Sequence, residues 1–305
     1  MSKYNINECF NIISRLTAPV NTPMAKIAGI ALSNVNDILN KIDGINNFTY
    51  KLDVNDGEIL IHVIKPQNNM DKMPCILDIH GGGFIFDGAP HMYEYAANYA
   101  LKTNSVVIFP RYRLTPKHNY PKQLNDCFMT YDWIKENSDM LNIDVNKIGI
   151  LGDSAGGYLA AMTVNYAASI GDKLLFQLLI YPVTDPLMST ESMKRFIDTP
   201  VWNAKNNKSM WNLYFRKQEI DRASQSLLIM DLPTNIPDTY IETAEFDCLH
   251  DEAILYANRL IKSNVNVFIN ETKETMHGFD EVKCQITDNA VNNRIEFLNK
   301  CISIR

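Results

Sequence analysis

The 305-residue chain has no run of about 18 consecutive apolar residues, the length that a membrane-spanning helix requires. Its polar N-terminus, from Met1 to Arg15, lacks the charged-then-apolar pattern of a secretory signal. Dense basic blocks are also absent, since 29 Lys and Arg stand against 35 Asp and Glu, for a net charge of −6. These absences predict a protein without a membrane span and argue against nucleic acid as a partner.

Cysteine is sparse, and no two cysteines form a C-x-x-C pair. The six are Cys9, Cys75, Cys127, Cys248, Cys284 and Cys301. This spacing excludes a zinc module and a dense disulfide framework, so we expect neither a metal nor a disulfide scaffold. We therefore expect reduced thiols and a cytoplasmic location.

The composition of the chain is typical of a globular protein, with 46% hydrophobic and 21% charged residues. This composition supplies a large core and excludes a disordered chain. The length allows one or two domains, because α/β folds often exceed 250 residues as a single unit.

Apolar strand-like segments alternate with helix-like segments along most of the chain. The expected strands are residues 75–80, 105–110, 147–151, 176–181, 238–243 and 265–270. The expected helices are residues 92–101, 121–137, 155–170, 252–262 and 290–301. Two earlier strands, residues 48–54 and 58–65, flank the hairpin signal Asn55-Asp56-Gly57. The pattern predicts an α/β fold with a mostly parallel central sheet, an antiparallel N-terminal hairpin and helices on both faces.

Some segments fall outside this alternation. Residues 5–16 and 24–42 have helical spacing of apolar positions, and residues 186–230 are rich in Met, Trp, Phe and Asn. We expect one domain over residues 1–305, with a helical cap formed by about 1–45 and 186–230.

One predicted strand–turn–helix segment carries Gly152-Asp153-Ser154-Ala155-Gly156, which fits the pattern G-x-S-x-G. Such a turn holds its serine in a strained conformation, and the flanking glycines let neighbouring chain approach closely. Ser154 would project above the sheet edge at a helix N-terminus, where the dipole favours developing negative charge. The segment predicts a nucleophilic serine.

Three consecutive glycines follow the expected strand 75–80, in the sequence HGGGF at residues 80–84. A glycine backbone turns readily, so amide N–H groups in this loop are able to point at a developing oxyanion. We expect Gly82 and Gly83 to be donors, with the amide of Ala155 as a third.

A nucleophilic serine needs a base and an acid, and in enzymes with this serine turn both follow the serine along the chain. That order leaves His250 and His277, and His277 falls in a loop between the last strand and the last helix. Four carboxylates precede His277 at or just beyond strand 238–243: Glu242, Glu245, Asp247 and Asp251. Asp247 lies in the loop where it would orient an imidazole, whereas Asp251 is also placed to cap the following helix.

The stretches HGGGF, YRLTP, GDSAGG, D-x-L-x-D-E and HGF together resemble the hormone-sensitive-lipase-like carboxylesterase family of the α/β-hydrolase fold. The resemblance runs from about residue 74 to the C-terminus, with the motifs in the family's order. It implies a catalytic triad of Ser154 as nucleophile, Asp247 as acid and His277 as base. It also implies an oxyanion hole formed by Gly82, Gly83 and Ala155, and an N-terminal helical cap.

Three positions depart from the family's pattern. Cys248 stands where Pro usually follows the acid, Lys117 where an acidic residue commonly follows Pro116, and Tyr158 where Asn is frequent. None of these positions belongs to the triad, so they bear on the surroundings of the cleft and on substrate preference.

The resemblance implies two-step acyl transfer to water from a small-molecule ester, without a metal or organic cofactor. A capped chain without a membrane span favours short-chain acyl or aryl esters. Residues 186–230 contribute large apolar side chains that would either line an apolar cleft or pack the cap onto the sheet: Met188, Met193, Phe196, Trp202, Met210, Trp211, Tyr214 and Phe215.

Other functions remain open on these grounds. An amidase or peptidase of the same fold would use the same residues. A non-catalytic small-ligand receptor, as the gibberellin receptors are on this scaffold, would have lost the base, and His277 is present. Edge-strand pairing on this fold leaves a homodimer open.

Overall fold

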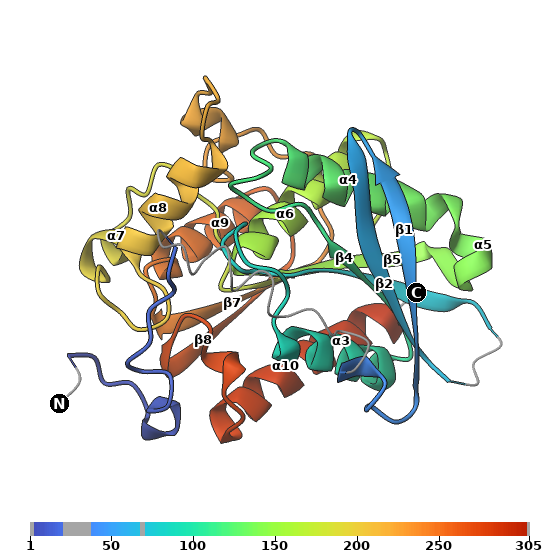
Figure 1. Cartoon of the computed structure of the whole chain (residues 1–305), viewed down its shortest axis with the longest axis horizontal. Helices are drawn as coiled ribbons and strands as arrows, with labels where there is room; N and C mark the ends of the chain where they lie inside the picture. The colour runs from blue at the N-terminus through green and yellow to red at the C-terminus, as the bar shows by residue number, and fades with distance from the viewer. Residues whose placement is uncertain (1–2, 21–37, 68–70, 304–305) are drawn as a thin grey trace.

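An eight-stranded sheet runs through the centre of the molecule and carries helices on both faces (Figure 1). The computed structural model describes residues 3–20, 38–67 and 71–303. The strands are β1 (Ile45–Val54), β2 (Gly57–Pro66), β3 (Met73–Ile79), β4 (Val106–Arg111), β5 (Ile143–Asp153), β6 (Gln177–Ile180), β7 (Thr239–Phe246) and β8 (Val267–Met276). Their order across the sheet is β1-β2-β4-β3-β5-β6-β7-β8.

The sheet is mixed at one end and parallel elsewhere. Strand β2 pairs antiparallel with both β1 and β4, and every further neighbouring pair is parallel. The hairpin turns at Asn55 and Asp56, and Asp56 has a φ of 63°, a conformation that Asp tolerates better than most residues. The predicted mostly parallel sheet with an antiparallel N-terminal pair is confirmed.

Each expected helix of the alternating region is present within a few residues of its expected bounds. The helices are α3 (Pro90–Thr103), α4 (Lys122–Glu136), α5 (Ser138–Leu141), α6 (Ser154–Ser169), α7 (Glu191–Arg195), α8 (Ala204–Tyr214), α9 (His250–Lys262) and α10 (Gln285–Ser303). The short helix α5 was not expected. Within the described ranges, no helix has the length and apolar character needed to cross a membrane.

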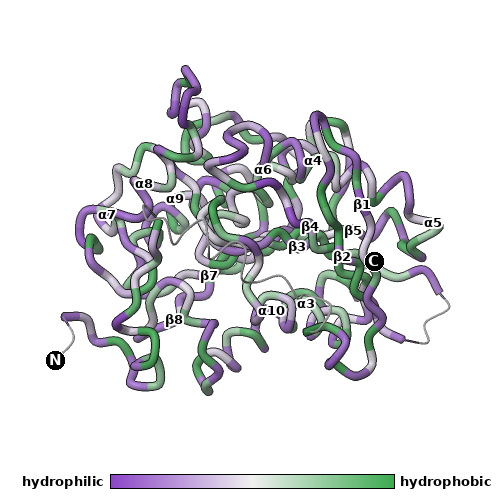
Figure 2. The backbone as a smooth tube through the Cα atoms, in the orientation of Figure 1, coloured by the Kyte–Doolittle hydropathy of each residue, from purple (hydrophilic) through white to green (hydrophobic). Residues whose placement is uncertain are grey.

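Apolar side chains fill the core on both faces of the sheet, because successive residues of a buried strand point to opposite sides. In β3, Leu77 packs on one side with α4, α6 and α9, whereas Ile76 packs on the other with α3 and α10. Figure 2 shows apolar residues concentrated along β2, β4 and β5, with polar residues in the outer turns. The two-sided burial explains why these strands have near-continuous apolar sequences.

The N-terminal residues differ from the expected helix at 5–16. Only a short 3-10 turn, Glu8–Phe10, forms there, capped by Asn7, whose side chain accepts the amide of Cys9. Beyond it the chain pairs with residue 201 through a bridge from Thr17. The expected helix at 24–42 lies mostly outside the described residues.

Residues 186–230 leave the sheet between β6 and β7. They carry α7, α8 and the 3-10 turn Arg222–Gln225, and they lie at the upper left in Figure 1. Strand β8 is longer than expected and continues to Met276, because its polar second half still pairs with β7. This extension delivers His277 to the edge of the sheet at which β5 ends.

Candidate active site

Ser154 occupies the junction between β5 and α6. Its φ is 53°, in the left-handed region that costs a non-glycine residue strain and that recurs at functional turns. The side chain is buried. Strand β5 before it and α6 after it form the strand–turn–helix that the G-x-S-x-G pattern predicts.

The flanking glycines are required by close packing around this turn. A Cβ on Gly156 would lie 1.9 Å from the carbonyl oxygen of Ile79, and a Cβ on Gly152 would lie 2.3 Å from the carbonyl oxygen of Gly156. No side chain fits at these separations. Because of this close packing, the end of β3 and the glycine loop that follows it lie against the first turn of α6.

Ser154, His277 and Asp247 lie in one continuous row. Oγ of Ser154 is 2.8 Å from Nε2 of His277, and Nδ1 of His277 is 2.7 Å from Oδ2 of Asp247. The remaining oxygen of Asp247 accepts the amide of Leu249, which fixes the orientation of the carboxylate. The three residues come from the end of β5, the loop after β7 and the loop after β8. They meet at the edge of the sheet where these parallel strands end.

The surroundings of His277 favour its protonated form. Burial by itself would lower the pKa of His277, but the negative charge of Asp247 and its hydrogen bond outweigh burial. The net effect raises the pKa above its ordinary value of 6.5. A base with this environment readily holds a proton taken from a neighbouring hydroxyl.

The glycine loop approaches the serine turn from β3. Gly82 and Gly83 have φ values of 99° and 61°, which favour glycine strongly. Among the described residues, no hydrogen bond uses the amide of Gly82 or Gly83 as a donor. The amide of Ala155 lies in the first turn of α6, where helix geometry provides no partner within the helix.

Asp153 connects the glycine loop to the serine turn. One of its carboxylate oxygens accepts the amide of Gly81 at 2.8 Å. Burial, followed by the charge of Asp280, raises the pKa of Asp153 to about 7. Tyr112, from the YRLTP stretch, supports the same loop by donating its hydroxyl to the carbonyl of His80.

The other candidate acids and the other candidate base have different partners. Glu242 is fully buried in an ion pair with Arg294, and Glu245 accepts the amide of Glu274. Asp251 accepts the amide of Ser192, so the expectation that it caps α9 is wrong; Leu249 occupies that position. His250 contacts Asp251 and Glu271 instead of Ser154.

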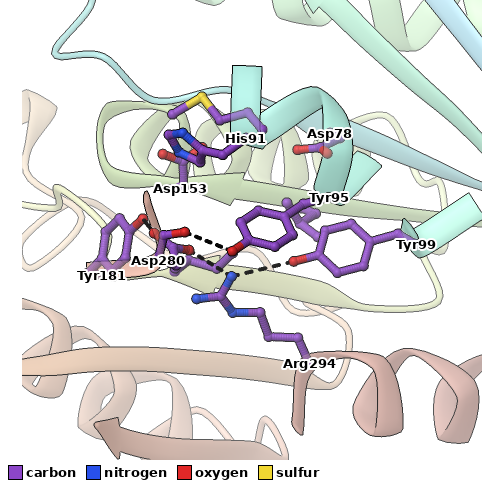
Figure 3. Close-up of a pocket in the computed structure, with 11 residues that line it drawn as sticks. Asp78, His91, Tyr95, Tyr99, Asp153, Tyr181, Asp280 and Arg294 are labelled. Carbon is purple, nitrogen blue, oxygen red and sulfur yellow. Dashed lines mark hydrogen bonds and ion pairs between the residues drawn. The ribbon is translucent and has the colours of Figure 1, made fainter. Parts of the chain in front are cut away.

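The sequence did not predict a buried network of charged and phenolic side chains near the row, among them Arg294, Asp280 and Tyr181, which Figure 3 shows together. Arg294 of α10 binds Asp280 at 2.8 Å, and the hydroxyl of Tyr181 donates to Asp280 at 2.5 Å. The ring of Tyr181 packs 4.6 Å from that of His277. A pocket of about 20 Å³ among these groups and Asp153 holds room for one water molecule. The one sequence feature that could have indicated this network is the position of Asp280, three residues after His277.

Trp202 is one of the side chains for which the sequence left two roles open, lining a cleft or packing the cap. A Cβ on Gly83 would lie 2.7 Å from its indole ring, and the indole lies 6.1 Å from the ring of His277. It is buried, with its Nε1–H donating to Asn207. Trp202 therefore forms a wall between the glycine loop and the histidine.

The departures from the family's pattern have structural roles around the site. The carbonyl of Cys248 accepts the hydroxyl of Ser192, and its thiol is buried beside Asp247. The hydroxyl of Tyr158 donates to the carbonyl of Gln225 and so ties α6 to the segment 186–230. Lys117 is exposed.

The described part of the chain holds no cluster of three or more His, Cys, Asp or Glu side chains suited to a metal ion. The chemistry that the site offers is therefore that of a buried hydroxyl, a paired imidazole and unpartnered amides. This set suits nucleophilic attack on a carbonyl carbon.

Comparison with known proteins identifies the fold, the family and the class of enzyme. A family model described as "alpha/beta hydrolase fold" matches residues 76–281. Carboxylesterase NlhH of Mycobacterium tuberculosis is 30% identical over 229 residues, which cover 73% of this chain and 71% of that protein. Arylesterase of Saccharolobus solfataricus is 28% identical over 241 residues, 75% of each chain.

The solved structure of "Bacterial Heroin Esterase" superposes with a TM-score of 0.87 at 28% identity and covers 98% of both chains. The likeness therefore extends over the sheet, its helices and the segment between β6 and β7. The chain belongs to the hormone-sensitive-lipase-like family of the α/β-hydrolase fold, and it is a carboxylesterase.

Proposed function

We propose that this carboxylesterase works through an acyl-enzyme formed on Ser154. The observation that carries the proposal is the row of contacts from Ser154 through His277 to Asp247, at 2.8 and 2.7 Å. His277 takes the hydroxyl proton as Ser154 attacks the ester carbonyl, and then returns it to the leaving alcohol. Water, activated by the same histidine, releases the acid.

The amides of Gly82, Gly83 and Ala155 stabilise the oxyanion in this proposal. Two observations support it: the positive φ angles of both glycines, and the tight packing of Gly156 that keeps the loop beside α6. Asp153 holds the loop through Gly81, so the donors are in position before substrate arrives.

We propose short-chain acyl or aryl esters as substrates. Large side chains of 186–230 are already packed: Trp211 and Tyr214 are fully buried, contact each other and contact Phe84 beside the glycine loop. They are thus not free to line a long apolar channel, and Trp202 closes the space beside His277. The related arylesterase is consistent with an aryl group in the substrate.

The cap and the assembly of the molecule complete the proposal. Residues about 1–45 and 186–230 form the cap of a single catalytic domain, supported by the bridge between Thr17 and residue 201. Strand β8 is at the edge of the sheet and offers a pairing surface for a homodimer, which light scattering would test. The acidic balance and the six cysteines outside any disulfide support a cytoplasmic enzyme without a nucleic-acid partner.

The central experiment compares Ser154→Ala with wild type on p-nitrophenyl esters from acetate to palmitate. We expect the variant to lose roughly 10⁶-fold in kcat, and the wild type to prefer the short esters. The exposed Ser169 of α6 supplies the matched control, Ser169→Ala, which should retain full activity.

Substantial turnover by Ser154→Ala would contradict the acyl-enzyme. Preference for palmitate over acetate would contradict the short-chain assignment. Faster cleavage of an anilide than of its matching ester would favour an amidase instead.

A further inference from the structure

Two cysteines from opposite ends of the chain meet at the surface, away from the row of catalytic contacts. The sulfur atoms of Cys9 and Cys284 lie 2.8 Å apart, although the residues are 275 positions apart in sequence. Both side chains are half-buried, whereas the other four cysteines are buried. Cys9 and Cys284 are therefore the two cysteines that a reagent in solution would reach.

The surroundings of Cys284 favour its thiolate. The residue directly precedes α10, and its carbonyl accepts the amide of Asp288 as the first turn begins. Burial would raise the pKa of Cys284, but hydrogen bonds from the Cys9 thiol and from the amides and hydroxyl of the first helical turn lower it below 9.0. The N-terminal end of a helix dipole acts in the same direction.

Cys9 is the complementary partner. Burial and its hydrogen bond to Cys284 raise the pKa of Cys9 to about 12, so Cys9 keeps its proton and donates it. Cys284 thus supplies a reactive thiolate, and Cys9 supplies a second thiol in contact with it. A redox-active pair of cysteines requires both. Once Cys284 is no longer a thiolate, that hydrogen bond is lost and Cys9 ionises more readily.

The pair joins segments that matter for the active site. Asn7 donates its amide to Glu274 at the end of β8, so the segment around Cys9 lies beside the strand that leads to His277. Phe10 packs edge-on against Phe279, whose ring in turn contacts Tyr181. A bond between the sulfur atoms would fasten the N-terminal segment to the loop that carries the catalytic histidine.

We propose that Cys9 and Cys284 form a reversible redox dithiol that closes to an intramolecular disulfide when a low-molecular-weight disulfide, such as glutathione disulfide, is present. The pair takes no part in ester hydrolysis, so the proposal stands apart from the proposed acyl-enzyme mechanism.

The chemistry balances in two exchange steps. The Cys284 thiolate attacks one sulfur of glutathione disulfide, forms a mixed disulfide and releases one glutathione thiolate. Cys9 then loses its proton to the released thiolate or to solvent and attacks Sγ of Cys284, which releases the second glutathione. One protein disulfide has formed, the dithiol has lost two electrons and two protons, and glutathione disulfide has become two molecules of glutathione. The sulfur atoms need to approach by only about 0.8 Å to reach bonding distance.

The main experiment incubates folded wild-type protein in glutathione buffers of increasing oxidised fraction, followed by alkylation of free thiols and peptide mass spectrometry. We expect a linked peptide pair that contains Cys9 and Cys284, which dithiothreitol reverses, while the buried cysteines stay unmodified until the protein is denatured. Oxidation should also raise the melting temperature by roughly 5 °C or more, because the link closes a very long loop in the unfolded chain.

Matched variants separate this pair from other thiol chemistry. Cys9→Ser should accumulate one glutathione adduct on Cys284 and show no rise in melting temperature, whereas Cys284→Ser should show neither adduct nor link. Cys301→Ala removes a thiol from the same helix and should oxidise as wild type does. Free alkylation of both thiols at the most oxidised ratio, or a disulfide between two molecules instead, would overturn the proposal.

Discussion

At the scale of single residues, the proposed mechanism depends on one histidine held between a hydroxyl and a carboxylate. His277 is buried, yet the charge of Asp247 keeps its pKa above 6.5. The carboxylate therefore both orients the ring and sets the pH at which the ring becomes a base. The backbone also contributes, because the strained φ of Ser154 places its hydroxyl against Nε2 of His277.

This environment predicts the pH dependence of the reaction. His277 accepts a proton only when neutral, so kcat/KM for a short aryl ester should fall as the pH drops through a midpoint above 6.5. Replacing the carboxylate in Asp247→Asn removes its charge, which should move the midpoint downward and lower kcat by roughly 10⁴-fold. The pH–rate profile of both proteins measures the shift.

The control for this prediction is Asp288→Asn, which removes an exposed carboxylate from α10. Its profile should match the wild type. A wild-type midpoint below 6.5, or an unchanged midpoint in Asp247→Asn, would contradict the role given to the carboxylate.

At the scale of elements, α10 and β7 are joined by a buried ion pair near the row of Ser154, His277 and Asp247. Arg294 is fully buried and binds Glu242 of β7 as well as Asp280 of the histidine loop. One cation binds two carboxylates, so the loop after β8 is fixed to two elements at once. The network thus links the stability of the helix to the position of His277.

Arg294→Met should lower the free energy of unfolding by about 3–5 kcal/mol, because it leaves two buried carboxylates without their cation. Urea denaturation measures the loss. Burial would raise the pKa of Asp280, but the charge of Arg294 helps to hold that pKa below its ordinary value. The stability from this pair is therefore present at neutral pH and is lost as the pH falls through that pKa. The deficit of Arg294→Met should therefore shrink at low pH. Arg15→Met, at an exposed position, is the control and should be nearly neutral, whereas wild-type stability in Arg294→Met would show that the network contributes little.

At the scale of the whole molecule, the described N-terminal segment runs from the end of β8 to residue 201, in the segment 186–230. It contacts Glu274 near the histidine loop and residue 201 beside Trp202, and in between it buries Phe10 completely. Residues 7–17 therefore lie next to the candidate active site. Without the N-terminal segment, the apolar surface that Phe10 covers would be exposed to solvent.

Phe10→Ala should reduce the free energy of unfolding by about 3–5 kcal/mol, since it removes a buried aromatic ring against Phe279. The neighbouring Ile12 is 77% exposed, so Ile12→Ala should change stability by about 0.5 kcal/mol or less. Denaturant titration of the two variants tests the difference. Equal effects would mean that the segment is only loosely attached.

Local features of the sequence determined much of this protein. Strand and helix alternation, the glycine-flanked turn at Ser154 and the loop at Gly82 and Gly83 were predictable, because each follows from neighbouring residues and backbone sterics. The expected helix at 5–16 was wrong, since contacts with β8 and with the segment 186–230 fix these residues in a non-helical path despite their apolar spacing.

Only the tertiary structure decided which distant groups meet. From order alone, four carboxylates and two histidines were candidates, and the sheet brought Asp247 and His277 to Ser154 while it placed Glu242 on Arg294. It also set Trp202 against the glycine loop and Cys9 against Cys284. The reason is physical: local sterics act within a few residues, whereas these contacts depend on strand order and on packing between elements far apart in the chain.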